Sequence, residues 1–352
     1  MNKERQMKTI LTLDYELFNG EVGGTVSNCI IKPTEELCKV LDKYCCKATF
    51  FVDVCFLLRL KNLQKEYDEL KGDWIAVTQQ LKWLASNGHD IELHIHPNWY
   101  RATYKDGIWT PYLNDYKLSD IPQTVSAAIF KEGIQLIEDI TGKRPVAFRA
   151  GAYCIQTYDQ YAYTFKENSI KIDSSVYRNR SSKTERWEWY DYTSIPKVYK
   201  YRFAEDVCVE DNNGGYIEVS IPSYKMNVLQ YFHYKIIDRR VQQSLLQKWG
   251  DGKTSIGGTL LPWPQRILSK IKRSFMPHFV PASIDGGNVN YLELLYRREL
   301  KNGEYFLIMG HPKLLSPYSI SCLDAFLNNN INTMEFVTID TLAKNDYIYI
   351  KD

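Results

Sequence analysis

The sequence lacks several features that would place it in a narrow class. No stretch approaches the ~18–20 consecutive apolar residues of a membrane-spanning helix, so we expect no transmembrane segment. The formal net charge is only +2 and no nucleic-acid-binding motif is present, so we expect no nucleic-acid partner. The eight cysteines show no paired C-x-x-C spacing, which favours reduced, mostly buried thiols over disulfides.

The N-terminus also lacks a secretion signal. The apolar run in MNKERQMKTILTLDYELF is short and is interrupted by Asp14 and Glu16. We therefore expect a cytoplasmic protein. The 352 residues are enough for one large α/β domain or two ordinary ones, and the hydrophobic content of 44% is typical of a globular chain.

Short apolar runs typical of strands alternate with helical patterns over the first half of the chain and again near its end. This alternation predicts βα units around a parallel sheet or barrel. The order weakens between about 178 and 285, so we expect one domain over residues 1–352 with a large insertion at 178–285. The expected strands are 8–16, 47–54, 89–97, 144–153, 170–177 and 304–313, with a final strand and turn in 334–345; the expected helices are 33–45, 74–86, 121–142, 288–300 and 322–329.

Polar residues end five of the expected strands. In βα-barrels the chemistry collects at the carboxyl ends of the strands, so polar residues at these ends are candidates for a site. These candidates are Asp14, Glu16, His94, His96, Arg149, Asp173, Ser174, Ser175, His311 and Lys313.

The spacing of these residues indicates a metal site. Residues i and i+2 of a strand point to the same face, so Asp14 and Glu16 share a face, as do His94 and His96. An H-x-H pair on one strand face can present two imidazoles to a divalent metal, and carboxylates at a neighbouring strand end strengthen that interpretation. Arg149 follows an apolar run, and a buried guanidinium needs a carboxylate partner, for which Asp14 or Asp173 would serve.

Together these segments resemble the polysaccharide deacetylase family, which is carbohydrate esterase family four and carries the NodB-homology domain. The resemblance extends from Thr12 to about Lys344 and includes, in order, TLDYE, KATFFV, GHDIELHIHPNW, FRAGAY, IDSSVY and LIMGHPK. The LHIHP segment is similar to that of a subgroup associated with surface-polysaccharide biosynthesis.

The resemblance implies both a fold and a reaction. The fold would be a distorted (β/α) barrel of about seven strands, and the reaction would remove N-acetyl groups from amino sugars with the help of a divalent metal. It implies that Asp14 is the catalytic base and that Arg149 orients it. It also implies that His311 is the general acid and that Asp173 pairs with His311 and tunes it.

Two positions depart from the family pattern. The family usually has an aspartate directly after the base, where this chain has Tyr15, and a second metal histidine four residues after the first, where it has Asn98. One interpretation is a site rebuilt from Glu16, His94 and His96, a set that suits zinc with an open position for water. A second keeps His94 and Asn98 as weak ligands, and a third is a site that binds sugar without hydrolysing it.

The expected substrate is an N-acetylated sugar or glycan, whose acetyl carbonyl the metal would polarise. Trp99 and Tyr153 directly follow two of the motifs, and we expect their rings to line the sugar cleft. Two other functions are considered: hydrolysis of a small non-sugar amide, and sugar binding by a degenerate deacetylase site.

The segment RILSKIKRSF at 266–275 combines cations with apolar residues at helical spacing. This pattern predicts either a solvated helix face or a peripheral contact with an anionic membrane surface.

Overall fold

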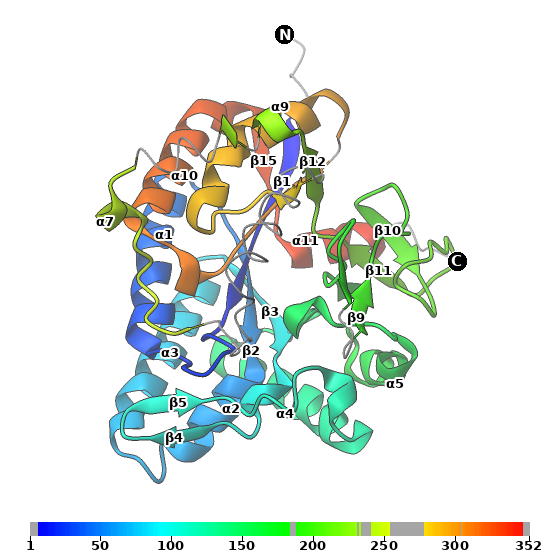
Figure 1. Cartoon of the computed structure of the whole chain (residues 1–352). Helices are drawn as coiled ribbons and strands as arrows, with labels where there is room; N and C mark the ends of the chain where they lie inside the picture. The colour runs from blue at the N-terminus through cyan, green and yellow to red at the C-terminus, as the bar shows by residue number, and fades with distance from the viewer. Residues whose placement is uncertain are drawn as a thin grey trace, which may run out of the picture.

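A curled, mostly parallel sheet lies at the centre of the molecule (Figure 1). The computed structural model describes residues 6–183, 188–230, 232–233, 241–253, 278–303 and 305–347. In these residues nine strands form one sheet, in the order β10-β11-β7-β6-β3-β2-β1-β14, with β15 also paired to β1. All pairs are parallel except β10–β11. The predicted α/β class is therefore confirmed.

The central strands of the main sheet, β1, β2, β3 and β6, are buried on both faces. In β1, for example, all residues except Lys8 are buried, as expected of a parallel strand covered by helices. The strands of the main sheet are β1 (Met7–Tyr15), β2 (Thr49–Asp53), β3 (Asp90–Ile95), β6 (Ala147–Ala150), β7 (Ile172–Asp173), β10 (Lys200–Phe203), β11 (Tyr216–Val219), β14 (Tyr305–Gly310) and β15 (Met334–Phe336). Three small antiparallel pairs are β4 (Thr103–Lys105) with β5 (Ile108–Thr110), β8 (Ser181–Lys183) with β9 (Glu188–Asp191), and β12 (Ser223–Met226) with β13 (His278–Pro281).

Helices follow most of the central strands, and their ends carry recognisable local signals. Pro33 lies in the first turn of α1, and the Asp53 carboxylate caps α2 by accepting a hydrogen bond from the Cys55 amide. Helix α4 ends at Gly142, which has the left-handed φ of 74° that glycine tolerates. The helices are α1 (Lys32–Lys43), α2 (Val54–Leu63), α3 (Glu69–Ser86), α4 (Gln123–Thr141), α5 (Asp159–Asn168), α7 (Gln243–Leu246), α9 (Leu292–Asn302), α10 (Pro317–Asn330) and α11 (Ile339–Tyr347).

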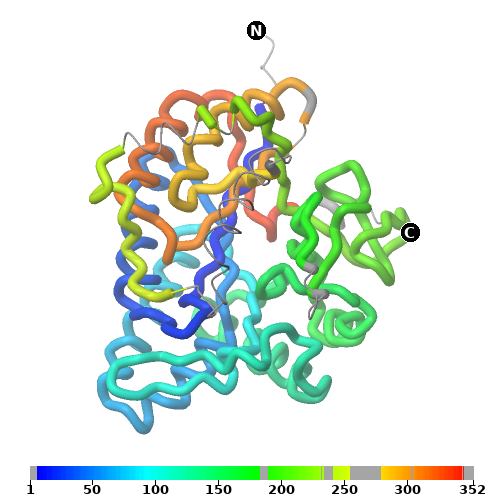
Figure 2. Tube along the Cα trace, viewed as in Figure 1, coloured from blue at the N-terminus to red at the C-terminus, as the bar shows by residue number. Residues whose placement is uncertain are grey.

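Part of the range 178–285 belongs to the main sheet, although the whole range was expected to be an insertion. Strand β11 pairs in parallel with β7, and β10 pairs antiparallel with β11. The alternating apolar side chains of these two strands are buried against the sheet. Figure 2 shows this green part of the chain as a lobe beside the blue and cyan strands. The structure also differs from the expected strand and turn in 334–345, because helix α11 forms where the turn was predicted.

Among the helices of the described residues, none is long and apolar enough to cross a membrane. The segment 266–275, for which a peripheral membrane contact was considered, lies outside the described residues.

Candidate active site

The carboxyl ends of four strands of the main sheet bring most of the predicted site residues together. Strands β3 and β6 are adjacent, with His94 opposite Arg149, and β1 is adjacent to β14, with Leu13 opposite Gly310. These ends contribute Asp14 and Glu16 from β1, His94 and His96 from β3, Arg149 from β6 and His311 from β14.

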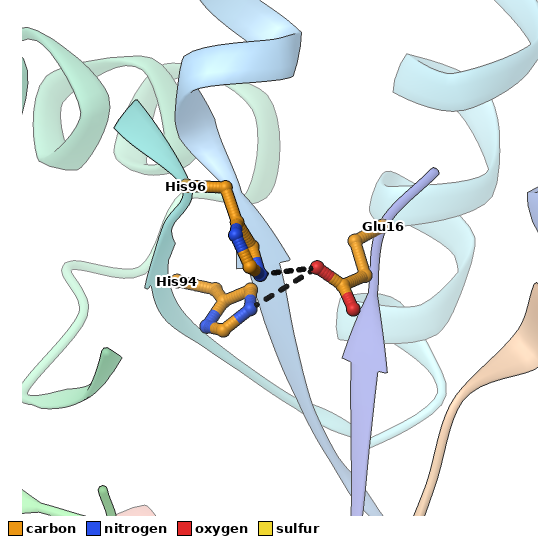
Figure 3. Close-up of side chains that lie close together, drawn as sticks. All are labelled: Glu16, His94 and His96. Carbon is orange, nitrogen blue, oxygen red and sulfur yellow. Dashed lines mark ion pairs between the residues drawn. The ribbon is translucent and has the colours of Figure 1, made fainter. Parts of the chain in front are cut away.

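The Glu16 carboxylate faces both histidines of the H-x-H pair (Figure 3). Its Oε2 lies 2.7 Å from Nε2 of His96 and 3.3 Å from Nε2 of His94, and all three side chains are buried. A carboxylate and two imidazoles form a ligand set that zinc accepts, and zinc–ligand bonds of about 2.0–2.2 Å in a tetrahedron separate such ligand atoms by roughly 3.3 Å. The cluster thus has the composition of a metal site; the His94–Glu16 distance matches this spacing, whereas the 2.7 Å between His96 and Glu16 is that of a hydrogen bond and would have to lengthen around a metal.

The hydrogen bond on the far side of His94 means that either a proton or a metal ion must lie between Nε2 of His94 and Glu16. Nδ1 of His94 lies 2.7 Å from the Arg149 carbonyl, which can only accept, so Nδ1 carries a proton. In the neutral imidazole, the lone pair of Nε2 then points toward the Glu16 carboxylate, and two acceptors face each other. A proton or a metal ion between them resolves this conflict, and a backbone carbonyl behind the ring is the usual way of orienting a metal-bound histidine.

Asn19 holds the second histidine and was not predicted from the sequence. Its Oδ1 accepts a hydrogen bond from Nε1 of Trp99, so its Nδ2 faces Oε2 of Glu16 at 3.1 Å and Nε2 of His96 at 3.0 Å. The ring of His96 also packs against Gly151, where an added Cβ would lie only 2.7 Å from Nδ1. Gly151 is therefore needed for His96 to occupy this position.

Lys313 neutralises the Glu16 carboxylate from the other side. Its buried ammonium lies 2.8 Å from Oε1 of Glu16 and donates to the carbonyl of Leu17 at the same distance. Burial alone would raise the pKa of Glu16, but Lys313, His96 and His94 together hold that pKa well below its ordinary value. Because Lys313 uses Oε1, Oε2 is left to the two histidines and to Nδ2 of Asn19.

Replacing Lys313 by methionine is expected to make the stability of the protein depend more strongly on zinc than that of the wild type does. The change leaves a buried carboxylate without its ammonium, which costs about 3–5 kcal/mol in the metal-free protein. It also removes a positive charge beside the ligand cluster, so zinc should raise the melting temperature more than in the wild type. Thermal unfolding of both proteins with zinc and with chelator measures this difference.

Lys39→Met provides the matched control, because Lys39 forms an exposed ion pair with Glu36. Its melting temperature and zinc response should equal those of the wild type. A zinc response of Lys313→Met no larger than that of the wild type would contradict the predicted role.

Arg149 is paired with Asp14, one of the two carboxylate partners expected for it from the sequence. Nη1 of Arg149 lies 2.6 Å from Oδ1 of Asp14, and the guanidinium also donates to Thr12 and to the backbone and side chain of Ser174. Burial would raise the pKa of Asp14, but Arg149, with smaller effects of His94 and His311, keeps it below its ordinary value. Asp14 is therefore an ionised carboxylate in a buried position.

The partner of His311 is Asp285, which corrects the expected pairing with Asp173. Nδ1 of His311 lies 2.7 Å from Oδ2 of Asp285, and the other oxygen of Asp285 accepts from the His311 amide. Nε2 of His311 faces Oδ2 of Asp14 at 3.4 Å. Burial lowers the pKa of His311, but Asp285 and then Asp14 outweigh it and raise that pKa to about 9. His311 is thus an imidazolium at neutral pH.

Asp173 lies below this site, within the sheet. Its Oδ1 accepts from the Ser175 hydroxyl at 2.6 Å, and that hydroxyl in turn accepts from the Ala150 amide. Its neighbour Glu218 is also buried, and each of the two carboxyl groups has a pKa above its ordinary value, mainly because of burial. Asp173 therefore fixes the chain beside Arg149 rather than the histidine.

Asp285→Asn is expected to move the alkaline limb of kcat/KM to lower pH. The resemblance implies that His311 is a general acid, which is active while protonated, so activity is expected to fall as the pH rises through the pKa of His311, about 9. Removing the Asp285 charge lowers that pKa, and an opposite charge this close is typically worth about 1–3 units. Activity measured from pH 6 to 10 gives the shift.

Asp173→Asn serves as the control for this experiment, since Asp173 contacts Ser175 instead of His311. Its alkaline limb should coincide with that of the wild type, whatever its stability. A shift in the Asp173 variant and none in the Asp285 variant would restore the pairing expected from the sequence.

A cavity of about 280 Å³, here named the inner cavity, opens onto these groups. Tyr153, expected to contact substrate, lies in its wall, and the left-handed backbone at Ala152 and Tyr153 places both there. Trp99 does not line it: the ring is fully buried among Phe56 and Trp109, so the structure corrects the expectation that it contacts sugar. The wall is completed by Asp14, Glu16, Asn19, His96, Tyr116, Ser182, Trp189, Tyr190, His311 and Lys313.

Asn98, the alternative ligand, is buried and donates from Nδ2 to Oδ1 of Asn19 at 3.4 Å. Its Oδ1 has no hydrogen-bond partner among the described residues. It therefore contacts the ligand cluster through Asn19, and its role as a ligand stays a prediction.

No family model matches this sequence, and no curated protein matches it. The fold is a distorted (β/α) barrel that is similar to those of several solved structures. One similar structure is a candidate polysaccharide deacetylase from Mycobacterium smegmatis, with a TM-score of 0.52, 12% identity, and coverage of 98% of this chain and 91% of that chain. Another is the allantoinase PuuE, with a TM-score of 0.50, 12% identity, and coverage of 99% and 93%. At this level of identity the likeness establishes the fold alone.

Proposed function

We propose that the protein is a metal-dependent hydrolase that removes the N-acetyl group from an amino sugar of a glycan or its precursor. The observation that carries this proposal is the buried arrangement around Glu16. Its Oε2 faces the two histidines of the ligand cluster, and the ionised carboxylate of Asp14 and the imidazolium of His311 lie next to this cluster. Glu16, His94 and His96 would hold the metal, for which zinc suits the donor set. When bound, that metal supplies a Lewis acid for the acetyl carbonyl and lowers the pKa of water.

Asp14 has the features of a general base. It is ionised, buried and held by Arg149 through Oδ1, while its Oδ2 is directed toward His311 and the inner cavity. A carboxylate in this position takes the proton of a water molecule as that water attacks the acetyl carbonyl. Arg149 keeps the carboxylate charged and fixed during the attack.

His311 has the features of the general acid. Its ring is protonated at neutral pH, is oriented by Asp285, and exposes Nε2 to the inner cavity on the same side as Asp14. Proton donation from Nε2 to the departing amine nitrogen allows the C–N bond to break and releases acetate with a free amino sugar. The opposite pKa shifts of Asp14 and His311 support Asp14 as the base and His311 as the acid.

The test is acetate release by the zinc-loaded protein from a panel of N-acetylated sugars, sugar nucleotides and oligosaccharides. We expect acetate from at least one of these substrates, and loss of that activity with chelator. Small amides such as allantoin belong in the same panel, since hydrolysis of such a compound without acetate release would favour the alternative function. No acetate from any acetylated substrate, with zinc bound, would overturn the proposal.

A further inference from the structure

Residues 248–253, here named the strap, connect two segments beside the active site. The Trp249 amide donates to the Leu315 carbonyl at 3.0 Å. The Lys253 amide donates to the Val22 carbonyl at 2.9 Å. The strap comes from the part of the chain that was expected to be an insertion, and it lies between two segments of the barrel.

The two connected segments carry the side chains that hold Glu16 from outside the ligand cluster. Lys313 lies two residues before Leu315 and donates to Oε1 of Glu16 at 2.8 Å. Asn19 belongs to residues 17–25, here named the β1 loop, and its Nδ2 donates to Oε2 of Glu16 at 3.1 Å. By fixing both segments, the strap can fix the partners of both oxygens of Glu16.

The strap approaches these segments so closely that two of its residues need to be glycine. A Cβ on Gly250 would collide with the Lys313 carbonyl oxygen, and a Cβ on Gly252 would collide with the ring of Phe18. The Lys248 ammonium lies 3.7 Å from the centre of the Phe18 ring and donates to the Gly252 carbonyl. Phe18 is fully buried, so the strap packs directly on the core of the β1 loop.

Asp251 fastens the strap to the end of the β1 loop. Its Oδ1 accepts from the Thr25 amide at 2.8 Å and from the Cys29 thiol at 3.3 Å. Its Oδ2 accepts from the Thr25 hydroxyl at 2.8 Å and from Nδ2 of Asn28 at 2.9 Å. Partial burial would raise the pKa of Asp251, but these hydrogen bonds lower it, so the carboxylate is ionised. Hydrogen bonds to an ionised acceptor are stronger than neutral ones, which makes this a firm attachment.

Trp99 gives the β1 loop a second attachment. Its Nε1 donates to Oδ1 of Asn19 at 2.6 Å, and its ring packs so closely on Gly23 that a Cβ there would lie 2.5 Å from Cη2. The indole fixes the orientation of the Asn19 amide, because the oxygen that faces it leaves Nδ2 for Glu16 and His96. The buried Trp99 therefore contacts the active site through Asn19.

We propose that Asp251 is a positioning residue of the active site, which acts through the β1 loop on the Asn19 amide. Asp251 is neither one of the proposed ligands nor part of the wall of the inner cavity, so its effect passes through the loop. A loop that loses an attachment samples more conformations, and the fraction of molecules in which Asn19 faces Glu16 then falls. The effect on zinc rests on the metal site proposed above, whereas the position of Asn19 does not.

The indole N–H resonance of Trp99, measured by NMR on the metal-free protein, tests this positioning. The hydrogen bond to Asn19 predicts a downfield resonance, which Trp99→Phe identifies by its loss and which Asn19→Ala should move upfield. We expect Asp251→Asn to move the resonance in the same direction as Asn19→Ala, and Asp251→Glu, which keeps the charge, to recover part of the shift. An unmoved Trp99 resonance in Asp251→Asn would overturn the proposal.

Zinc affinity provides a second arm, in the form of a double-mutant cycle. Asn19→Ala removes an outer partner of a ligand carboxylate, which typically lowers metal affinity by roughly 10–100-fold. Asp251→Asn should weaken zinc binding at least about threefold when Asn19 is present and less than about twofold in the Asn19→Ala background, because the two residues act in series. Equal losses in the two backgrounds would show a general structural effect and would overturn the proposal.

Asp90→Ala is the control for a loss of stability alone. Asp90 also joins two segments, since its Oδ2 accepts from the Thr49 hydroxyl at 3.0 Å and from the Asp340 amide at 3.1 Å, but it lies at the amino end of β3, away from the site. The change leaves two donors unpaired and should lower the free energy of unfolding. The Trp99 resonance and the zinc affinity should stay unchanged, and a shift as large as that of Asp251→Asn would overturn the proposal.

The two proposals fail in different ways. A Trp99 resonance that moves in Asp251→Asn, in a zinc-loaded protein that releases no acetate, would support the positioning role and refute the hydrolase. Acetate release by a protein whose Trp99 resonance does not respond to Asp251→Asn would refute the positioning role and leave the function standing.

Discussion

Asp14→Asn is expected to lower kcat/KM by roughly 10²–10⁴-fold, which is the usual contribution of a positioned general base. The amide has nearly the shape of the carboxylate but cannot take a proton from water. Asp14 is not one of the three proposed ligands Glu16, His94 and His96, so the variant should still bind zinc, whereas loss of zinc would favour the second possible ligand group, Asp14, Glu16 and His311. Acetate release and zinc binding, measured on the same preparation, separate the two effects.

The control for this variant is Asp53→Asn, a second buried carboxylate close to the two histidines. Asp53 caps α2 and accepts from the His96 amide, but it is not among the residues that line the inner cavity. Its loss should change stability more than kcat/KM. An Asp14 variant that keeps activity within about threefold of the wild type would contradict the assignment of the base.

Arg149→Leu is expected to destabilise the protein by about 3–5 kcal/mol, because it leaves a buried carboxylate without its partner. The guanidinium is fully buried, donates to Asp14, Thr12 and Ser174, and packs 4.2 Å from the centre of the Phe51 ring. Lysine cannot replace this planar set of donors, so Arg149→Lys should recover only part of the loss. Denaturant unfolding gives the free energy of unfolding for each variant.

Arg144→Leu is the matched comparison, since Arg144 pairs with Glu138 at the surface, with 42% and 39% of the two side chains exposed. Exposed pairs typically contribute about 0–1 kcal/mol, so this change should have a small effect. If the two arginine variants lost similar stability, the buried contacts of Arg149 would contribute no more to the free energy of unfolding than an exposed ion pair.

The sequence predicted the central strands well, because parallel strands buried on both faces are nearly continuous apolar runs. Strands β1, β2, β3 and β14 lie within or very close to the expected ranges. Helix α2 was not expected, since its sequence VCFLLRLKNL follows β2 without a turn and its polar residues, Arg59, Lys61 and Asn62, are confined to its second half.

The search for polar residues at the carboxyl ends of the expected strands located those site residues that lie at the end of a regular strand. Glu16, His94 and His96 could be placed on matching faces because strand geometry determines direction. Asp285 could not be found in this way because it lies in an irregular segment. That segment runs beside β14, where Ser283 makes an isolated bridge to Met309 of the strand. Only the spatial neighbourhood of β14 shows that its carboxylate reaches His311.

Other residues that line the inner cavity escaped prediction for a similar reason. Asn19 and Tyr116 come from loops and Trp189 from the short strand β9, and a polar or aromatic residue in such a segment, which has no clear repeating pattern, has many equally plausible positions. Trp99 shows the converse, because its closeness to a motif in sequence does not reveal that the ring turns inward to the core.

The most direct test of the central claim is the zinc stoichiometry and affinity of the purified protein and its ligand variants. We predict one zinc per chain, with affinity reduced at least about 100-fold in His94→Ala and in His96→Ala, since loss of a ligand should cost no less than loss of an outer partner. Asn98→Ala should bind zinc like the wild type. Undiminished binding by His96→Ala together with loss in Asn98→Ala would contradict the rebuilt site and restore the family positions.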